Sequence, residues 1–138
     1  MLYKKNIYFI QIIISIILLI GCSKVREKEY YADTENYITE EAIVDNIIYN
    51  EEYDYVVFWL SEIDDSYQCS NFIIEGESVS TILENDILNK VKIGDEITYT
   101  SAPRFFGNGD FMPIVELYIG DEEILSFEVG YKNLMKLY

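Results

Sequence analysis

The chain has 138 residues, of which 25 are acidic and 10 basic, with a formal net charge of −15 and no histidine. Without histidine, the Ser-His-Asp and Cys-His catalytic arrangements and the HExxH zinc site are impossible, so a hydrolase would need a lysine base or paired carboxylates. The acidic excess disfavours binding to nucleic acid and electrostatic adhesion to an anionic membrane. If charge attracts a partner, that partner is cationic.

The first 22 residues have the pattern of an export signal. Lys4 and Lys5 precede an apolar run from Ile7 to Ile20, which only Gln11 and Ser15 interrupt. This run has 14 residues, whereas a helix that spans a bilayer core of about 30 Å needs about 20 apolar residues. A short apolar core behind a basic start is typical of a cleavable secretory signal.

The residues that follow this run carry a more specific pattern. Leu19-Ile20-Gly21-Cys22 resembles the lipobox of bacterial lipoproteins, in which small and aliphatic residues precede a modified cysteine. The resemblance implies that residues 1–21 are removed as a signal peptide and that the Cys22 sulfur carries a diacylglycerol group. We therefore expect a lipid anchor at the cell membrane, with the mature protein on the extracytoplasmic side. An uncleaved anchor with an incidental cysteine is the alternative.

Cleavage before Cys22 would leave 117 residues, which is enough for one domain with a modest core. All 25 acidic residues but only eight of the 10 basic ones follow that point, so the formal charge becomes −17. Residues 23–36 are polar, charge-mixed and aperiodic, and we expect them to form a flexible tether between the lipidated Cys22 and a domain over residues 37–138. Cys69 is then without a disulfide partner, and we expect it to be a small buried residue.

Residues 37–138 are predicted to be mostly strand. Six segments rich in β-branched and aromatic residues, separated by polar or glycine turns, are the candidate strands: Ile38–Tyr49, Tyr53–Ile63, Cys69–Glu75, Glu96–Ala102, Pro113–Ile119 and Glu123–Val129. One helix is predicted over Ser78–Val91, because apolar side chains recur there at helical spacing, namely Val79, Ile82, Leu83 and Ile87. Residues 131–138 form a short amphipathic end that we expect to be helical.

Three strands, a helix and then further strands follow the order of an OB-type barrel. In that fold one helix closes the end of the barrel between the third and fourth strands. We therefore predict a mainly β protein, a small OB-like barrel of five to six strands with one internal helix and a short C-terminal helix. Another partly open barrel, and an α+β sheet with one helix across it, are the alternatives.

A loop over residues 103–112 carries the side chains that we expect to bind a ligand. Arg104, Phe105, Phe106 and Phe111 flank a glycine-containing stretch, and loops rarely carry three phenylalanines unless they pack down or meet a partner. Packing back over the mouth of the barrel is the alternative. Most aromatic side chains of the strands are expected to fill the interior, as they do in other small barrels.

The acidic residues do not form a recognisable metal or catalytic site. Residues 64–65, 108–110 and 121–123 could supply oxygen ligands to calcium, but none has the spacing of an EF-hand loop, and acidic residues are ordinary in turns. With so many acids, some carboxylate pair will reach by chance the separation that glycoside hydrolysis needs. We expect no metal and no cofactor.

These features favour a binding or interaction module without catalysis of its own. The expected partners are the membrane, through the lipid on Cys22, and a cationic envelope protein or peptide, or a cell-wall glycan. An enzyme that acts on wall polymers through paired carboxylates, and a structural subunit of an envelope complex, are the alternatives.

Overall fold

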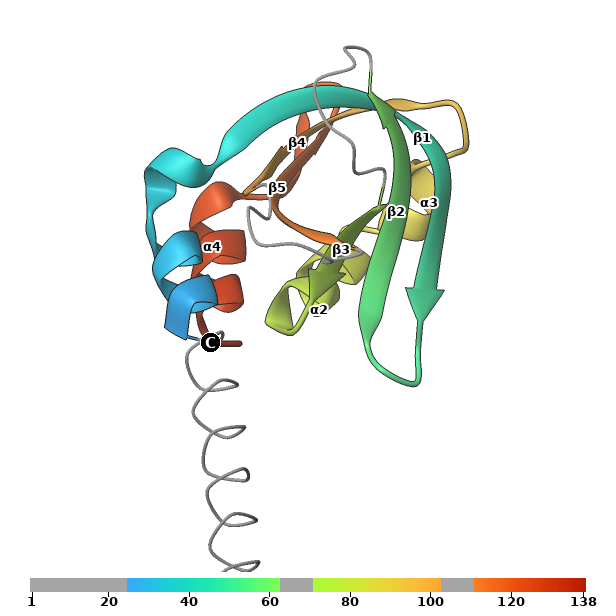
Figure 1. Cartoon of the computed structure of the whole chain (residues 1–138). Coiled ribbons are helices and arrows are strands. Elements are labelled where there is room, and N and C mark those ends of the chain that lie inside the picture. Colours follow the sequence, from blue (N-terminus) through green and yellow to red (C-terminus); the bar gives the residue numbers. More distant parts are fainter. Residues whose placement is uncertain (1–24, 63–70, 103–110) are drawn as a thin grey trace, which may run out of the picture.

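The computed structural model describes residues 25–62, 71–102 and 111–138. Within these ranges six strands form one sheet, which curves into a barrel (Figure 1). The strands are β1 (Ile38–Asn50), β2 (Tyr55–Glu62), β3 (Asn71–Glu75), β4 (Glu96–Ser101), β5 (Met112–Ile119) and β6 (Glu122–Leu125). The helical segments are residues 25–32, the 3₁₀ turn η1 (Thr34–Asn36), α2 (Glu77–Glu84), α3 (Ile87–Lys90) and α4 (Phe127–Met135).

The strand order β3-β2-β1-β4-β5-β6 becomes a ring because β3 also pairs with β5. Neighbouring strands are antiparallel except at this closure, where β3 and β5 run parallel and Phe72 pairs with Met112. The long strand β1 pairs with β2 along one edge and with β4 along the other. Helices α2 and α3 lie between β3 and β4 in the chain, as the OB order requires. The predicted mainly β, OB-like barrel is confirmed.

A β-bulge in β1 sets which residues of that strand face the core. Val44 and Asn46 pair with consecutive residues of β2, so Asp45 is an extra residue. The bulge moves the core-facing positions from even-numbered residues such as Val44 to odd-numbered residues such as Ile47. Without the extra residue, the aliphatic side chains after the bulge would exchange their faces.

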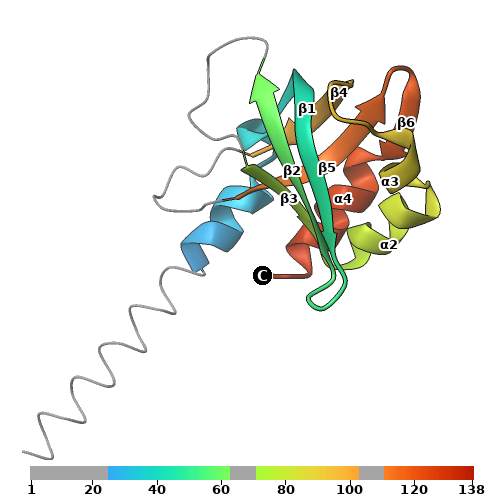
Figure 2. The ribbon, with the colours of Figure 1, turned by 90° about the vertical axis from the view of Figure 1, so that its right-hand side faces the viewer.

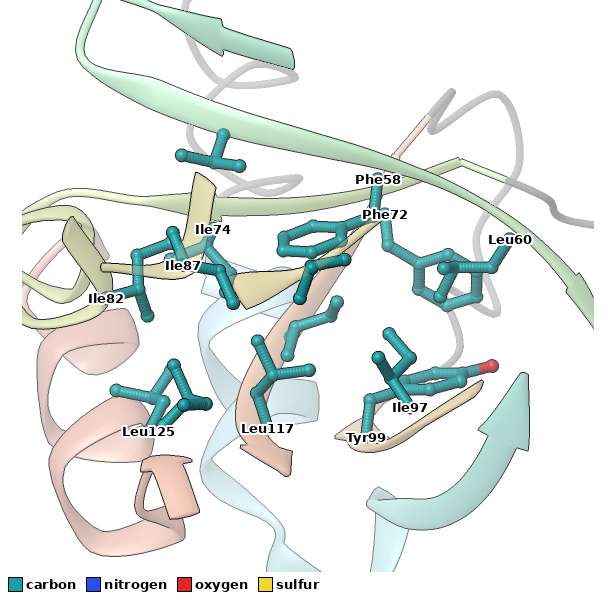
Figure 3. Packing of buried hydrophobic residues seen from close by; sticks show 14 of the residues in the cluster. Phe58, Leu60, Phe72, Ile74, Ile82, Ile87, Ile97, Tyr99, Leu117 and Leu125 are labelled. Carbon is teal, nitrogen blue, oxygen red and sulfur yellow. The ribbon is translucent and has the colours of Figure 1, made fainter. Parts of the chain in front are cut away.

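Large apolar side chains from all six strands and from α2 and α3 fill the barrel interior (Figure 3). The rings of Phe72 and Tyr99 meet edge to face with their centroids 4.7 Å apart, an arrangement that aromatic pairs favour. Ile82 of α2 and Ile87 of α3 are fully buried in the same cluster. The interior is therefore a packed core, as in other small barrels.

The single helix predicted over Ser78–Val91 is instead two short helices, α2 and α3. Asp86, between them, has a φ of 59°, in the left-handed region, which interrupts the helix. The side-chain amide of Asn85 donates to the carbonyl oxygens of Thr81 (3.1 Å) and Ile124 (2.9 Å). The hydrogen bond to Ile124 connects the break between α2 and α3 to β6.

The predicted sixth strand is wrong beyond Leu125. Ser126 begins helix α4, because its Oγ accepts a hydrogen bond from the Val129 amide (3.4 Å). Phe127 and Val129 favour strands by type, but here they are helical, because α4 packs against β5. Tertiary packing thus overrides the local β preference of these residues.

The expectation of a flexible tether over residues 23–36 is wrong for the described part of that segment. Residues 25–32 are helical, and η1 follows them. Tyr31 is fully buried in a second apolar cluster with Ala102, Val115 and Leu134. The charged residues of the segment are mostly exposed, so its composition resembles that of a tether although one side of it is buried.

Candidate functional site

Four of the five site residues predicted from the sequence lie outside the described residues: Cys22, Arg104, Phe105 and Phe106. Phe111 is described and half-buried. It directly precedes β5, one residue before Met112 pairs with Phe72 of β3. Phe111 therefore lies at the margin of the sheet surface that β1, β2 and β3 form.

The face of β1, β2 and β3 that points away from the core carries a row of aliphatic side chains. Ile48, Val57 and Ile73 are direct cross-strand neighbours in this row. Ile48 is 47% exposed and Ile73 is half-buried, whereas Val57 in the middle is buried. Figure 2 shows the three strands together on one side of the molecule, with α4 behind them. Ile48 and Ile73 therefore leave apolar side chains accessible on the outside of the sheet, on either side of the buried Val57, and accessible apolar side chains of this kind can meet another molecule.

Aromatic side chains flank this aliphatic row. Trp59 of β2 is half-buried, and its cross-strand neighbours are Asn46 and Asn71. Tyr55 and Trp59 alternate with the core-facing residues of β2, so they lie on the same side as Val57. We call the surface formed by these side chains the outer face: Ile48, Tyr55, Val57, Trp59 and Ile73.

The hairpin between β1 and β2 borders the outer face and is both acidic and aromatic. Tyr53 is 69% exposed, in a turn with three acidic residues. Asn50 shapes this turn, because its Oδ1 accepts from the Tyr53 amide (3.0 Å) and its Nδ2 donates to the Tyr55 hydroxyl (3.2 Å). The Tyr49 hydroxyl donates to Asp54 Oδ1 (3.0 Å), and this bond raises the pKa of Tyr49. The turn therefore presents an exposed ring among carboxylates.

Charge is distributed unevenly over the molecule. The six strands contain nine acidic residues and neither lysine nor arginine. Basic residues of the described ranges lie in the helices or in the turns that follow α3 and α4, and they are Arg26, Lys28, Lys90, Lys92, Lys132 and Lys136. Two of these form ion pairs, Lys90 with Glu122 and Lys136 with Glu77. All charged residues on the strands that form the outer face are therefore negative.

A polar ladder crosses β1, β4 and β5. The Thr100 hydroxyl donates to Glu116 Oε2, so the Thr39 hydroxyl is the donor in the 2.7 Å bond between the two threonine oxygens. Between β5 and β6, the Tyr118 hydroxyl donates to Glu123 Oε2 (2.8 Å), which raises the pKa of Tyr118. The carboxylates of Glu116 and Glu123 thus accept hydrogen bonds within the sheet.

No group of three or more metal-ligating side chains occurs among the residues that the structure describes. In the same ranges, no helix has the length and apolar character needed to cross a membrane. A shallow depression of about 360 Å³ lies beside the helix over residues 25–32, and it is lined by Arg26, Glu29, Tyr30, Asp33 and Asn36. It mixes one guanidinium with two carboxylates and shares no residue with the outer face.

Comparisons of the chain with protein-family models, with curated proteins and with solved structures find no match. The class of protein is therefore defined by the structure itself, as a small, mainly β, OB-like barrel with flanking helices. Barrels of this kind host many unrelated functions, so the function has to be argued from the outer face and the charges around it.

The prediction that most strand aromatics fill the interior is met by Phe58, Phe72 and Tyr99, whereas Tyr55 and Trp59 belong to the outer face. The sequence of β2, YVVFWLSE, has apolar residues at both alternating positions, so hydrophobicity does not identify its inner side. The sequence does contain one indication of the outer side. Tyr55 and Trp59 each lie an even number of positions before Ser61, so they lie on the same side of β2 as this polar, exposed residue. That pattern favours the outside for all three.

Proposed function

We propose that this protein is a membrane-anchored extracytoplasmic binding module, without catalysis of its own, whose outer face takes a cationic segment of a partner protein. The observation that carries the proposal is an apolar and aromatic surface on strands whose charged residues are all acidic. Apolar contact would supply affinity, and the surrounding carboxylates would select a partner rich in lysine or arginine.

The shape of the outer face suits a peptide segment. The row from Ile48 through Val57 to Ile73 crosses three strands, and adjacent strands lie about 4.8 Å apart, so the row spans about 10 Å. Trp59 adds a broad ring beside the row, and tryptophan is enriched among the residues that dominate binding energy. The surface can therefore seat a few apolar side chains of a partner while neighbouring cations meet the carboxylates.

We propose that the predicted loop residues Arg104, Phe105 and Phe106 also take part in binding. Support comes from Phe111, which belongs to the same sequence pattern and lies half-buried at the margin of the three strands. A cell-wall glycan is the rival ligand for the same surface, because sugars also stack on flat rings with a polar edge. Salt should weaken the binding of the cationic segment and should leave the binding of a glycan unchanged.

The anchoring part of the proposal rests on the lipobox-like sequence that ends at Cys22. Expression of the full chain in a bacterial host with labelled palmitate tests it. The wild-type chain should incorporate the label and float with membranes, and Cys22→Ser should do neither. A wild-type chain without label would contradict the lipid anchor.

Binding at the outer face can be measured directly, because Trp59 is the only tryptophan of the chain. A ligand that covers Trp59 should shift its emission to shorter wavelength. A short peptide of alternating lysine and leucine should produce this shift and saturate, whereas one of alternating glutamate and leucine should not. Binding should weaken at high salt, since exposed charges are screened over about 10 Å at an ionic strength of 0.1 M.

A matched pair of substitutions tests the location of the site. Ile48→Ser should raise the dissociation constant of the lysine peptide by about tenfold, as expected for the loss of one aliphatic contact. Leu88→Ser is the control, because Leu88 lies on α3 and is 39% exposed, against 47% for Ile48. Equal effects would exclude the outer face as the site. Glycan binding that ignores salt and is abolished by Phe105→Ala would favour the rival ligand.

A further inference from the structure

The helix over residues 25–32 is fastened to the barrel at its C-terminal end. Tyr31 is fully buried there, with its ring 5.2 Å from that of Tyr138. The Tyr131 hydroxyl donates to the Ala32 carbonyl oxygen (2.9 Å), and the Tyr37 hydroxyl donates to the Tyr31 carbonyl oxygen (2.8 Å). Residues on and after α4, and the residue directly before β1, thus hold this helix in place.

The cysteine that resembles a lipid attachment site lies only three positions before this helix. Cys22 and Val25 are separated by two residues, and three residues of fully extended chain span at most about 11 Å. A lipid on Cys22 would therefore hold the start of the helix close to the membrane surface. Because the helix is fastened to the barrel, the whole domain would share that restriction.

The part of the molecule next to the anchor differs in charge from the rest. Residues 25–36 and 126–138, which we call the anchor pole, contain four basic and five acidic residues. The other described residues, 37–62, 71–102 and 111–125, contain two basic and 17 acidic residues, a formal charge of −15. Figure 1 shows the helix of residues 25–32 beside α4 on one side of the molecule, with β2 and the end of β1 on the other.

Exposed apolar side chains accompany the cations of the anchor pole. Val25, Val129 and Leu137 are 56%, 39% and 45% exposed. Val129, Lys132 and Lys136 follow one another at spacings of three and four residues, so they lie on one face of α4 and its C-terminal end. The Lys136 ammonium pairs with Glu77 of α2, whereas no ion pair is found for Lys132 among the described residues. Exposed apolar side chains beside a lysine are typical of surfaces that meet lipid headgroups.

We propose that the anchor pole lies against the headgroups of the membrane that holds the Cys22 lipid, so that the outer face points away from that membrane. The inference rests on the proposed lipid anchor. Anionic headgroups repel the barrel, whose charge is −15, much more than they repel the nearly neutral anchor pole. The fastened helix allows the domain to adopt the orientation that keeps most of its carboxylates farthest from the membrane.

Quenching of fluorophores by the bilayer tests this orientation. Each variant is the full lipidated chain with Cys69→Ser and one introduced cysteine, so that a single fluorophore is attached at one chosen position. In anionic vesicles with a quencher on the lipid headgroups, labels at Val129→Cys and Leu137→Cys should be quenched several-fold more than labels at Leu88→Cys and Ile93→Cys. Equal quenching at all four positions would overturn the proposal.

Two controls separate the possible failures. If the wild-type chain does not float with vesicles, the lipid anchor and the orientation both fall. If it floats but the labels are quenched alike, only the orientation is wrong. A glycine-serine linker inserted before Val25 lengthens the connection without altering the barrel, and it should reduce the difference between the two pairs of labels. An undiminished difference would show that the short connection does not set the orientation.

Discussion

Gly130 of α4 packs directly on the backbone of Val115 in β5. A Cβ atom on Gly130 would lie 1.9 Å from the carbonyl oxygen of Val115 and 2.6 Å from its carbonyl carbon. The helix approaches the strand this closely only because residue 130 has no side chain. The same approach brings Leu134 into the cluster that buries Tyr31, so the position of the N-terminal helix depends on a glycine 99 residues away from Tyr31 in the chain.

Gly130→Ala should therefore destabilise the protein by about 3 kcal/mol, because the obstacle is main chain and cannot rotate away. Urea unfolding followed by circular dichroism measures the loss. Gly120→Ala is the comparison, since nothing lies within 4 Å of its Cβ position and only its φ of 58° opposes a side chain. That conformation should cost about 1 kcal/mol. A loss at Gly130 no larger than at Gly120 would contradict the close packing.

Tyr31→Ala should weaken the packing of residues 25–32 by about 3–5 kcal/mol, the range for removing a buried aromatic side chain. Amide hydrogen exchange should then rise over residues 25–32 more than in β1. Tyr53→Ala removes the same side chain where it is 69% exposed, so stability should change by less than about 0.5 kcal/mol. If Tyr31→Ala left exchange in residues 25–32 unchanged, Tyr31 would not be what fastens this helix.

Stability should decline at alkaline pH in a way that depends on Tyr37. Burial, and then the neighbouring tyrosines Tyr131 and Tyr31, raise the pKa of the Tyr37 hydroxyl above its ordinary value of 10.0. The unfolded chain loses this proton at a lower pH than the folded chain does. The stabilising contribution is therefore complete below about pH 10 and is lost as the pH rises toward the folded pKa.

Urea unfolding at a series of pH values on either side of pH 10 measures this decline. Tyr37→Phe should flatten it, because the substituted ring has no proton to lose. The variant should also lose about 1 kcal/mol at neutral pH, since the hydrogen bond to the Tyr31 carbonyl oxygen is removed. An equally steep alkaline decline in the variant would show that Tyr37 is not responsible.

The barrel was predictable because its strands have strong local patterns. Strands β1 to β5 begin and end within two residues of the predicted bounds, and their order with the helices already indicated the OB arrangement. The helix over residues 25–32 was not predictable in this way. Its local composition is charged, and it is ordered by contacts with residues about 100 positions away, such as Tyr131 and Tyr138.

The outer face could not be predicted from the sequence for a different reason. Both alternating sides of β2 are apolar, so the direction of Trp59 depends on which partners the strand meets on each side. In β1 the bulge at Asp45 changes the alternation midway, and it places Ile48 outside although its neighbours Ile47 and Tyr49 also carry large apolar groups. Register and bulges are set by pairing between distant segments, which one sequence does not reveal.

Asn85 joins α2 to β6 through two hydrogen bonds that require donors on its side chain. The amide donates to the carbonyl oxygens of Thr81 (3.1 Å) and Ile124 (2.9 Å). Asn85→Asp keeps the size and shape of the side chain, but it replaces the donating amide nitrogen with an oxygen that faces the two carbonyl oxygens. We expect a loss of about 2 kcal/mol at neutral pH.

This destabilisation should depend on pH. The carbonyl oxygens disfavour a carboxylate at position 85, so the folded protein should raise the pKa of the substituted side chain. Stability should then recover as the pH falls and a proton restores one donor. Asn89→Asp is the matched control on α3, because Asn89 is exposed and donates only to the exposed Asp86 (2.6 Å), so its cost should stay below about 1 kcal/mol. A loss at position 85 that did not vary with pH would show that the two hydrogen bonds are not its cause.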